Sequence, residues 1–220
     1  MQSKRPIISF KTLTLTTKLI WLMLAFEFVA GLFTARYSVS FLALGTFVVT
    51  FVPFIVVRQF DVYVPRRFMG AIIFFIFATL FLGEVFDFYN RYWWWDVVLH
   101  GGSAIGFGLI GFLAVFMLFQ GDRYAAPPLA IGLFGFCFAL SIGALWEVFE
   151  YAMDQTFGMS MQKSGLQDTM WDLIVDAIGG LIGSGAGVIY LIRDQDTPFA
   201  TLFRDFITHN KRFFAKFRSK

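Results

Sequence analysis

Residues 95–119 of the chain read WDVVLHGGSAIGFGLIGFLAVFMLF. An α-helix needs about 20 apolar residues to cross the hydrocarbon core of a bilayer, and this stretch is long enough to do so. Its ionisable residues, Asp96 and His100, both stand near its start. The stretch therefore predicts a membrane-spanning helix that begins with a carboxylate and an imidazole on one face, one turn apart.

The composition extends this interpretation to the whole chain. Of 220 residues, 58% are hydrophobic and 15% are charged, and the mean hydropathy is +0.69. A soluble domain is about half apolar and about a quarter charged, so the composition excludes an ordinary soluble protein. We predict an all-α integral membrane protein, a six-transmembrane-helix bundle, because further apolar runs of suitable length lie at 18–35, 39–57, 68–86, 127–152 and 171–192.

The distribution of lysine and arginine predicts the orientation. These residues gather in the N-terminal segment 1–18, in the loop 58–67 and after the last span, over 193–220. Because short cytoplasmic loops carry the excess of Lys and Arg, we predict that both termini are cytoplasmic. Residues 1–195 are predicted to form a single transmembrane domain. In 196–220, Phe and basic residues recur near helical spacing, which predicts an amphipathic cytoplasmic C-terminal helix on the anionic leaflet.

Carboxylates and one histidine gather at the ends of the last three predicted spans. Within each span they are three or four residues apart, so each set projects from one face of its helix. Small residues continue these faces and allow the helices to approach closely. With the predicted topology, the sets meet in one outer-facing pocket. Its members are Asp96 and His100 in the fourth span, Glu147 and Glu150 in the fifth, and Asp168, Asp172 and Asp176 in the sixth.

The chemistry of this pocket indicates a metal site. Several carboxylates close together repel one another unless some are protonated or a cation lies among them. Oxygen ligands with one imidazole suit Zn²⁺, Mg²⁺, Mn²⁺ or Ca²⁺, and the identity of the ion stays open. Glu147 or Glu150 is then the predicted general base. Alternatively, Asp168 and Asp172 cap the sixth helix and complement its dipole. The predicted metal ligands are Asp96, His100, Asp168, Asp172 and Asp176.

A resemblance to known proteins rests on three segments, WWDVVLHGGSAIGFG, EVFEY and GLQDTMWDLIVDAIGGLIG. They look like the signature segments of the YjdF-like family of bacterial membrane proteins. More distantly they resemble VanZ-like proteins, in which an Asp-x-x-x-His helix start and a glutamate-bearing helix precede an Asp-rich helix. The match covers about residues 80–190. The resemblance implies a small multi-pass inner-membrane protein and no particular activity.

The predicted function is that of a metal-dependent membrane hydrolase or transferase acting on a lipid or a lipid-linked phosphate. One alternative is a cation or proton transporter or channel, although the inner halves of the last three spans carry no charged residue that could line a path. Another is a non-catalytic lipid-binding or assembly factor. Membrane lipids are the predicted partners, nucleic acid is not, and the sequence leaves a homo-oligomer open.

Overall fold

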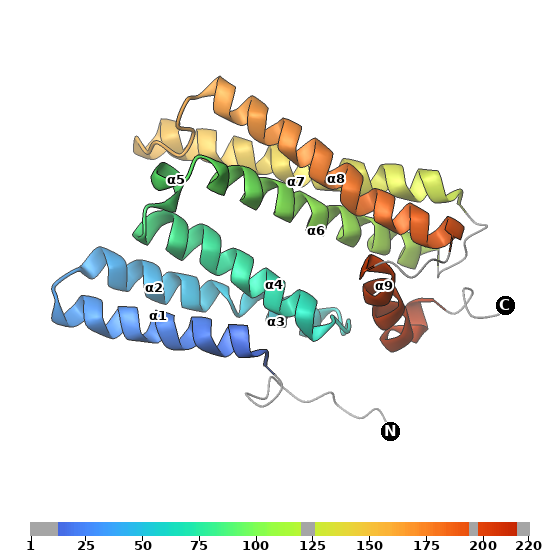
Figure 1. Ribbon diagram of the computed structural model, residues 1–220, viewed down its shortest axis with the longest axis horizontal. Helices are drawn as coiled ribbons and strands as arrows, with labels where there is room; N and C mark the ends of the chain where they lie inside the picture. The colour runs from blue at the N-terminus through green and yellow to red at the C-terminus, as the bar shows by residue number, and fades with distance from the viewer. Residues whose placement is uncertain (1–12, 120–125, 194–197, 215–220) are drawn as a thin grey trace. The chain divides into compact units, whose positions relative to one another are not determined.

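The computed structural model describes residues 13–119, 126–193 and 198–214 (Figure 1). Within these ranges the chain is helical and contains no strand. Six helical segments are long and apolar enough to cross a membrane, which confirms the predicted fold class. They are Leu15–Phe33, Tyr37–Gln59, Arg66–Gly83, Trp94–Leu118, Pro128–Phe157 and Leu166–Arg193.

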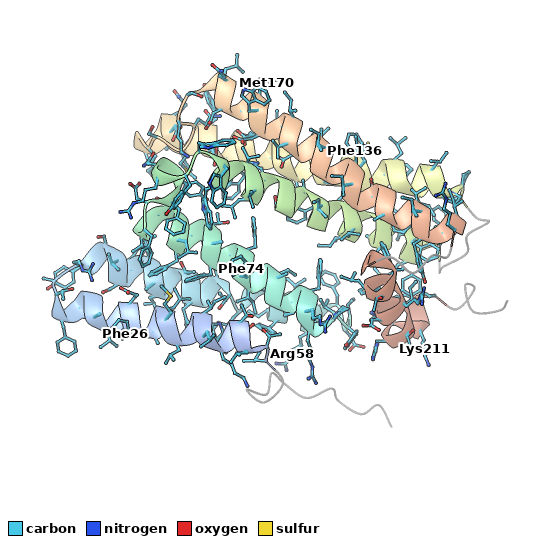
Figure 2. The ribbon with its side chains drawn as sticks, viewed as in Figure 1. Phe26, Arg58, Phe74, Phe136, Met170 and Lys211 are labelled. Carbon is cyan, nitrogen blue, oxygen red and sulfur yellow. The ribbon has the colours of Figure 1, made fainter. Side chains whose placement is uncertain are left out.

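The chain divides into two compact units, Met1–Trp93 and Trp94–Lys220. Large apolar side chains such as Phe26 in the first unit and Met170 in the second point outward from their helices (Figure 2). Lipid-facing surfaces have this character, because lipid tails are as apolar as the side chains. The division into a transmembrane domain over 1–195 and a tail over 196–220 stays a prediction.

The first unit contains three spans. Its elements are α1 (Leu15–Phe33), α2 (Tyr37–Val49), α3 (Val52–Gln59), α4 (Arg66–Phe77), the π-helix η2 (Ala78–Gly83) and the short α5 (Phe88–Arg91). The second predicted span is interrupted between α2 and α3. Pro53 stands in the first turn of α3 and has no backbone N–H to continue the hydrogen bonds of α2, so the helix ends and restarts there.

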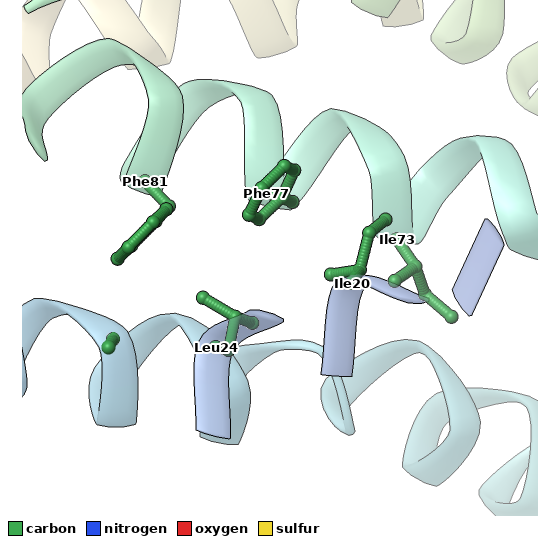
Figure 3. Close-up of a cluster of buried hydrophobic side chains, with 6 residues drawn as sticks. Ile20, Leu24, Ile73, Phe77 and Phe81 are labelled. Carbon is green, nitrogen blue, oxygen red and sulfur yellow. The ribbon is translucent and has the colours of Figure 1, made fainter. Parts of the chain in front are cut away.

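A small apolar core holds the first unit together (Figure 3). It consists of Ile20, Leu24, Ala43, Ile73, Phe77 and Phe81, contributed by α1, α2, α4 and η2. Beside it the indole of Trp21 donates a hydrogen bond to the hydroxyl of Thr50 at 3.0 Å. This bond satisfies a polar pair at the interruption of the second span.

The second unit contains the other three spans and carries every predicted site residue. Its elements are α6 (Trp94–Leu118), α7 (Pro128–Phe157), α8 (Leu166–Arg193), α9 (Pro198–His209) and the 3-10 turn η3 (Lys211–Phe213). Helices α6, α7 and α8 pack against one another. A Cβ at Gly108 would lie 2.7 Å from the carbonyl oxygen of Gly180, and one at Gly135 would lie 2.8 Å from the backbone nitrogen of Phe112. The predicted close approach through small residues is confirmed.

Helices α7 and α8 extend further than the apolar runs that predicted them. α7 continues to Phe157 instead of ending at residue 152, and α8 begins at Leu166 instead of residue 171. The added turns carry polar and acidic residues, so hydropathy falls before the helix ends. Gly158 has φ 65° and closes α7 as its C-cap, a left-handed conformation that glycine adopts without steric cost.

The described part of the C-terminal tail is helical and amphipathic, as predicted, but protein covers its apolar face. The ring of Phe203 stacks on Tyr190 of α8 at 5.1 Å and meets Phe112 of α6 edge-on at 5.7 Å. Phe214, which is buried, lies 5.4 Å from the ring of Phe116. The apolar side of α9 thus packs against α6 and α8, whereas the sequence predicted that it would lie on lipid. The rest of the predicted helix, including Phe217, lies outside the described residues, as does most of the basic N-terminal segment.

Candidate functional site

The site lies where α6 begins, α7 ends and α8 begins. The chain path alternates in direction through these helices, so these three ends come together (Figure 1). Close backbone approach holds them there: a Cβ at Gly179 of α8 would lie 2.6 Å from the carbonyl oxygen of Gly101 on α6. Glycine at 143 on α7 leaves room for the carboxylate of Asp176, which a Cβ at that position would overlap.

His100 is the centre of the site and is 8% exposed. Its Nδ1 lies 3.4 Å from Oδ2 of Asp176, which is 1% exposed. Its Nε2 lies 3.8 Å from Oδ1 of Asp96 and 4.0 Å from Oε1 of Glu147. We assign the ring proton to Nδ1, which then donates to the Asp176 carboxylate and leaves Nε2 directed at the other two acids.

Glu147 is the most unusual residue of the site. It is 4% exposed, and neither of its carboxylate oxygens has a hydrogen-bond partner among the described residues. An ionised carboxylate removed from water without a partner costs several kcal/mol, so buried acids are ordinarily paired, protonated or bound to a metal. The imidazole of His100, 4.0 Å from Oε1, offsets this charge when it is protonated. With a neutral imidazole, Glu147 needs a proton or a bound cation.

The ligand atoms form two groups with metal-like spacing. The buried group consists of His100, Glu147 and Asp172, and the half-exposed group of Asp96, Asp168 and Asp172. Within each group one ligand atom per residue lies within 4.8 Å of the others. Ligands bound at about 2.0–2.6 Å from one ion can be at most about 5 Å apart, so both groups have a suitable span.

Asp168 and Asp172 behave differently with respect to helix capping. Oδ2 of Asp168 accepts a hydrogen bond from the backbone N–H of Lys163 at 3.1 Å, which ties the α7–α8 loop to the start of α8. Asp172 is 5% exposed and accepts no backbone N–H among the described residues. The capping alternative thus describes part of the role of Asp168 and does not describe Asp172.

Two predicted site residues lie outside both groups. Asp176 contacts the far nitrogen of His100, so it holds the ring instead of facing the ligand atoms. Glu150 is half-buried and accepts a hydrogen bond from the indole of Trp146, one turn away on α7, at 2.9 Å. Neither position was evident from spacing, because spacing gives the face of a helix and not the depth of a side chain in the bundle.

Lys163 and Asp154 have roles that the sequence did not predict. The ammonium of Lys163 lies 3.8 Å from Oδ2 of Asp96. Asp154 accepts hydrogen bonds from the backbone N–H groups of Met161 and Gln162 at 2.7 and 3.0 Å, which shapes the α7–α8 loop. An acid near a helix end followed by a short loop between glycines could have indicated the role of Asp154.

Comparison with known proteins agrees with this architecture. A family described as predicted membrane protein, DUF2238, matches residues 16–193. The chain belongs to this family. It is also similar to a Thermotoga maritima protein titled "Uncharacterized protein", with 29% identity over 104 residues, which are 47% of this chain and 53% of the relative. The chain thus spans about half the length of that relative. No solved structure matches it.

The family match supports the coarse form of the resemblance to YjdF-like proteins, a multi-pass membrane protein. The more distant resemblance to VanZ-like proteins stays a prediction. The match runs from α1 to the end of α8, so it covers the six long apolar helical segments and stops before α9.

The charges of the site decide what it can do chemically. Among the described residues, carboxyl groups outnumber the cationic groups that contact them, which are the ammonium of Lys163 and, when protonated, the imidazole of His100. The excess has to be neutralised by protons or by added cations. An imidazole held by one acid and facing others is an arrangement that suits both proton transfer and metal binding.

Proposed function

We propose that the second unit binds a divalent cation between His100, Glu147 and Asp172. The observation that carries this proposal is the pair of unpartnered oxygens of Glu147, buried within 4.8 Å of ligand atoms on two other helices. A cation there supplies a partner for a carboxylate that has no hydrogen-bond partner among the described residues. One nitrogen and several oxygens suit Zn²⁺ or Mn²⁺ better than Ca²⁺, because imidazole is the softer ligand.

Asp176 has a supporting role in this proposal. Ligating histidines commonly donate their other ring N–H to a carboxylate, which fixes the tautomer and orients the ring. Asp176 lies on Nδ1 of His100 in that manner, so Nε2 becomes the ligand. Asp176, predicted from spacing as a ligand, is here proposed as a positioning residue.

The function proposed for the protein is that of a metal-dependent hydrolase or transferase for a lipid or lipid-linked phosphate. The site lies at the ends of membrane spans, the level at which lipid headgroups lie. A divalent cation polarises a phosphoryl oxygen and favours attack by water or another acceptor. Glu150 is the proposed general base, because it lies one turn from Glu147 and belongs to neither group of ligand atoms. By the distribution of Lys and Arg, the site faces outward across an inner membrane.

The proposal favours an enzyme over a transporter for a specific reason. Beyond the site, α6, α7 and α8 carry no Asp, Glu, Lys or Arg over 101–118, 128–146 and 177–192. Conducting paths generally need polar groups along their length. A non-catalytic role for a structural cation is the remaining alternative.

Thermal unfolding tests the cation site. The detergent-solubilised protein, stripped with chelator, should unfold at a higher temperature when Zn²⁺ or Mn²⁺ is added, since a ligand that binds only the folded state stabilises it. Glu147→Gln keeps the size of the side chain and should remove this increase. If no divalent ion stabilises the wild type, or if the variant responds equally, the cation proposal is wrong.

A separate assay tests catalysis. The metal-loaded protein is incubated with lipid-linked phosphates in mixed micelles, and release of phosphate is measured for the wild type, His100→Gln and Glu150→Gln. Loss of turnover in both variants, with metal retained in Glu150→Gln, supports the enzyme. Metal binding without turnover of any phosphate supports the structural role instead.

A further inference from the structure

Asp172 belongs to both groups of ligand atoms, so its carboxylate could bind an ion in each group. In the buried group it stands with His100 and Glu147, and in the half-exposed group with Asp96 and Asp168. A carboxylate has two oxygens and can bind one cation through each of them. We propose that the site holds two divalent cations bridged by Asp172. This inference rests on the proposed function, because it adds a second ion to the first.

Burial separates the half-exposed group from an ordinary cluster of surface acids. Asp172 is 5% exposed, and no hydrogen bond to its carboxylate is found among the described residues, although it lies between two other acids. Glu147, on its other side, also has no hydrogen-bond partner there. A divalent ion at the buried group offsets the charges of Glu147 and Asp172. The carboxylates of Asp96 and Asp168 then still have to be neutralised, and the ammonium of Lys163 near Asp96 offsets one of them.

The two positions differ in chemistry. The buried group offers an imidazole nitrogen and two carboxylates, a set that suits Zn²⁺ or Mn²⁺. The half-exposed group offers carboxylate oxygens alone, the ligands that Mg²⁺ and Mn²⁺ prefer. Asp96 and Asp168 are partly exposed, so water can complete the coordination of the second ion.

Lys163 connects the second ion to the α7–α8 loop. Its backbone N–H donates to Asp168, and its ammonium lies 3.8 Å from Asp96. The ammonium supplies positive charge at the half-exposed group in the absence of an ion. A cation bound to Asp96 and Asp168 would repel this ammonium, so binding of the second ion displaces the side chain.

A pair of cations favours a phosphate substrate over a carboxylic ester. Two-metal sites with ions about 3.5–4 Å apart stabilise both the attacking and the leaving oxygen in displacements at phosphorus. The substrate class that suits the proposed pair is therefore a phosphate ester or anhydride carried on a lipid. A carboxylic ester needs only one Lewis acid and does not require the second ion.

Loading with Mn²⁺ tests both the number of bound ions and whether they lie close enough for their electron spins to couple. The detergent-solubilised full chain is stripped with chelator and saturated with Mn²⁺. Bound metal is then measured by elemental analysis, and its electron paramagnetic resonance spectrum is recorded. The wild type should bind two Mn²⁺ per chain with a spin-coupled spectrum. Asp168→Asn should bind one uncoupled Mn²⁺, since the remaining oxygen of asparagine can still accept the Lys163 N–H and keep the loop in place.

Two further variants keep the outcome interpretable. Glu150→Gln changes an acid next to the site that belongs to neither group, and it should retain two coupled ions. Asp96→Asn repeats the loss of the second ion through a different ligand, should Asp168→Asn fail to fold. Three results would overturn the bridged pair and leave the single-ion proposal standing. The first is one bound ion in the wild type, and the second is two ions without spin coupling. The third is an unchanged coupled pair in both Asp168→Asn and Asp96→Asn. No bound ion at all would overturn both.

Discussion

Replacing Gly143 by alanine tests whether Asp176 positions the imidazole. The added Cβ would overlap the carboxylate of Asp176, whose Cγ would lie 2.8 Å and whose Cβ would lie 3.2 Å away. Asp176 is buried on α8, so its carboxylate has to move and its 3.4 Å contact with Nδ1 of His100 is lost or lengthened. The substitution therefore changes the site without touching any proposed ligand.

The expected magnitude follows from what a supporting carboxylate contributes. Removing such a group typically weakens metal binding about 10–100-fold, which is about 1.4–2.8 kcal/mol. At a metal concentration of about 100 times the wild-type Kd, the ion stabilises the folded protein by about 2.7 kcal/mol. In Gly143→Ala the same concentration should contribute only about 0.4–1.4 kcal/mol, by the same relation.

A matched glycine provides the control. Gly102 lies on α6 two positions from His100, and a Cβ there meets nothing within 4 Å. Gly102→Ala should bind the cation as the wild type does, with a small gain in helix stability. The assay is titration of the chelator-stripped protein with Zn²⁺, followed by the shift in thermal unfolding. Equal affinities in the two alanine variants would refute the positioning role, and Asp176→Asn provides a second test should Gly143→Ala not fold.

Three further predictions concern the fold and the topology. Gly108→Ala should lower the free energy of unfolding by about 1–3 kcal/mol, because its Cβ would meet the backbone of α8. Gly185→Ala is the control, since a Cβ there meets nothing within 4 Å and should not lower this free energy. Chemical denaturation of the two variants measures the difference. Phe203→Ala should cost about 3–5 kcal/mol and expose α9 to protease, since its ring is buried between α6 and α8; undiminished protection would contradict that packing. Reporter fusions after Arg58 and after Lys163 should report opposite compartments, and a shared compartment would disprove the orientation.

The spans were predictable from sequence because bilayer thickness imposes a length that an apolar run must meet. The ends of the spans were less predictable. Pro53 divides the second span, although the hydropathy of 39–57 is continuous, and α7 continues past residue 152 because acidic turns can remain helical. Hydropathy measures the solvent preference of side chains, while helix ends depend on backbone groups such as the left-handed Gly158.

The tail shows a different limit of sequence reasoning. An amphipathic pattern predicts that one face of a helix leaves water, but it does not say what covers that face. The basic residues of 196–220 favoured anionic lipid, and the structure places Phe203 against Tyr190 and Phe112 instead. Lipid and protein cores present similar apolar surfaces, so the two outcomes leave the same pattern in the sequence.

The site was predictable as a set of residues but not as a set of roles. Spacing brought Asp96, His100, Asp172 and Asp176 to common faces, and the structure confirms that they converge. Whether an acid is a ligand or a positioning residue depends on which nitrogen of the imidazole it contacts. Asp176 contacts Nδ1 while Glu147 faces Nε2, and the place of Asp176 depends on Gly143, which a pattern of acids does not include.

Glu147 shows why burial has to be combined with spacing. As one acid among several at a helix end, it was as good a general base as Glu150, its neighbour one turn along α7. The structure separates them: the indole of Trp146 satisfies Glu150, whereas the carboxylate of Glu147 is enclosed without a hydrogen-bond partner among the described residues. A general base has to reach solvent or substrate, and a metal ligand does not. The enclosed acid therefore suits the proposed ligand role and the half-buried one the proposed base, whereas the sequence predicted a base at either glutamate and a ligand at neither.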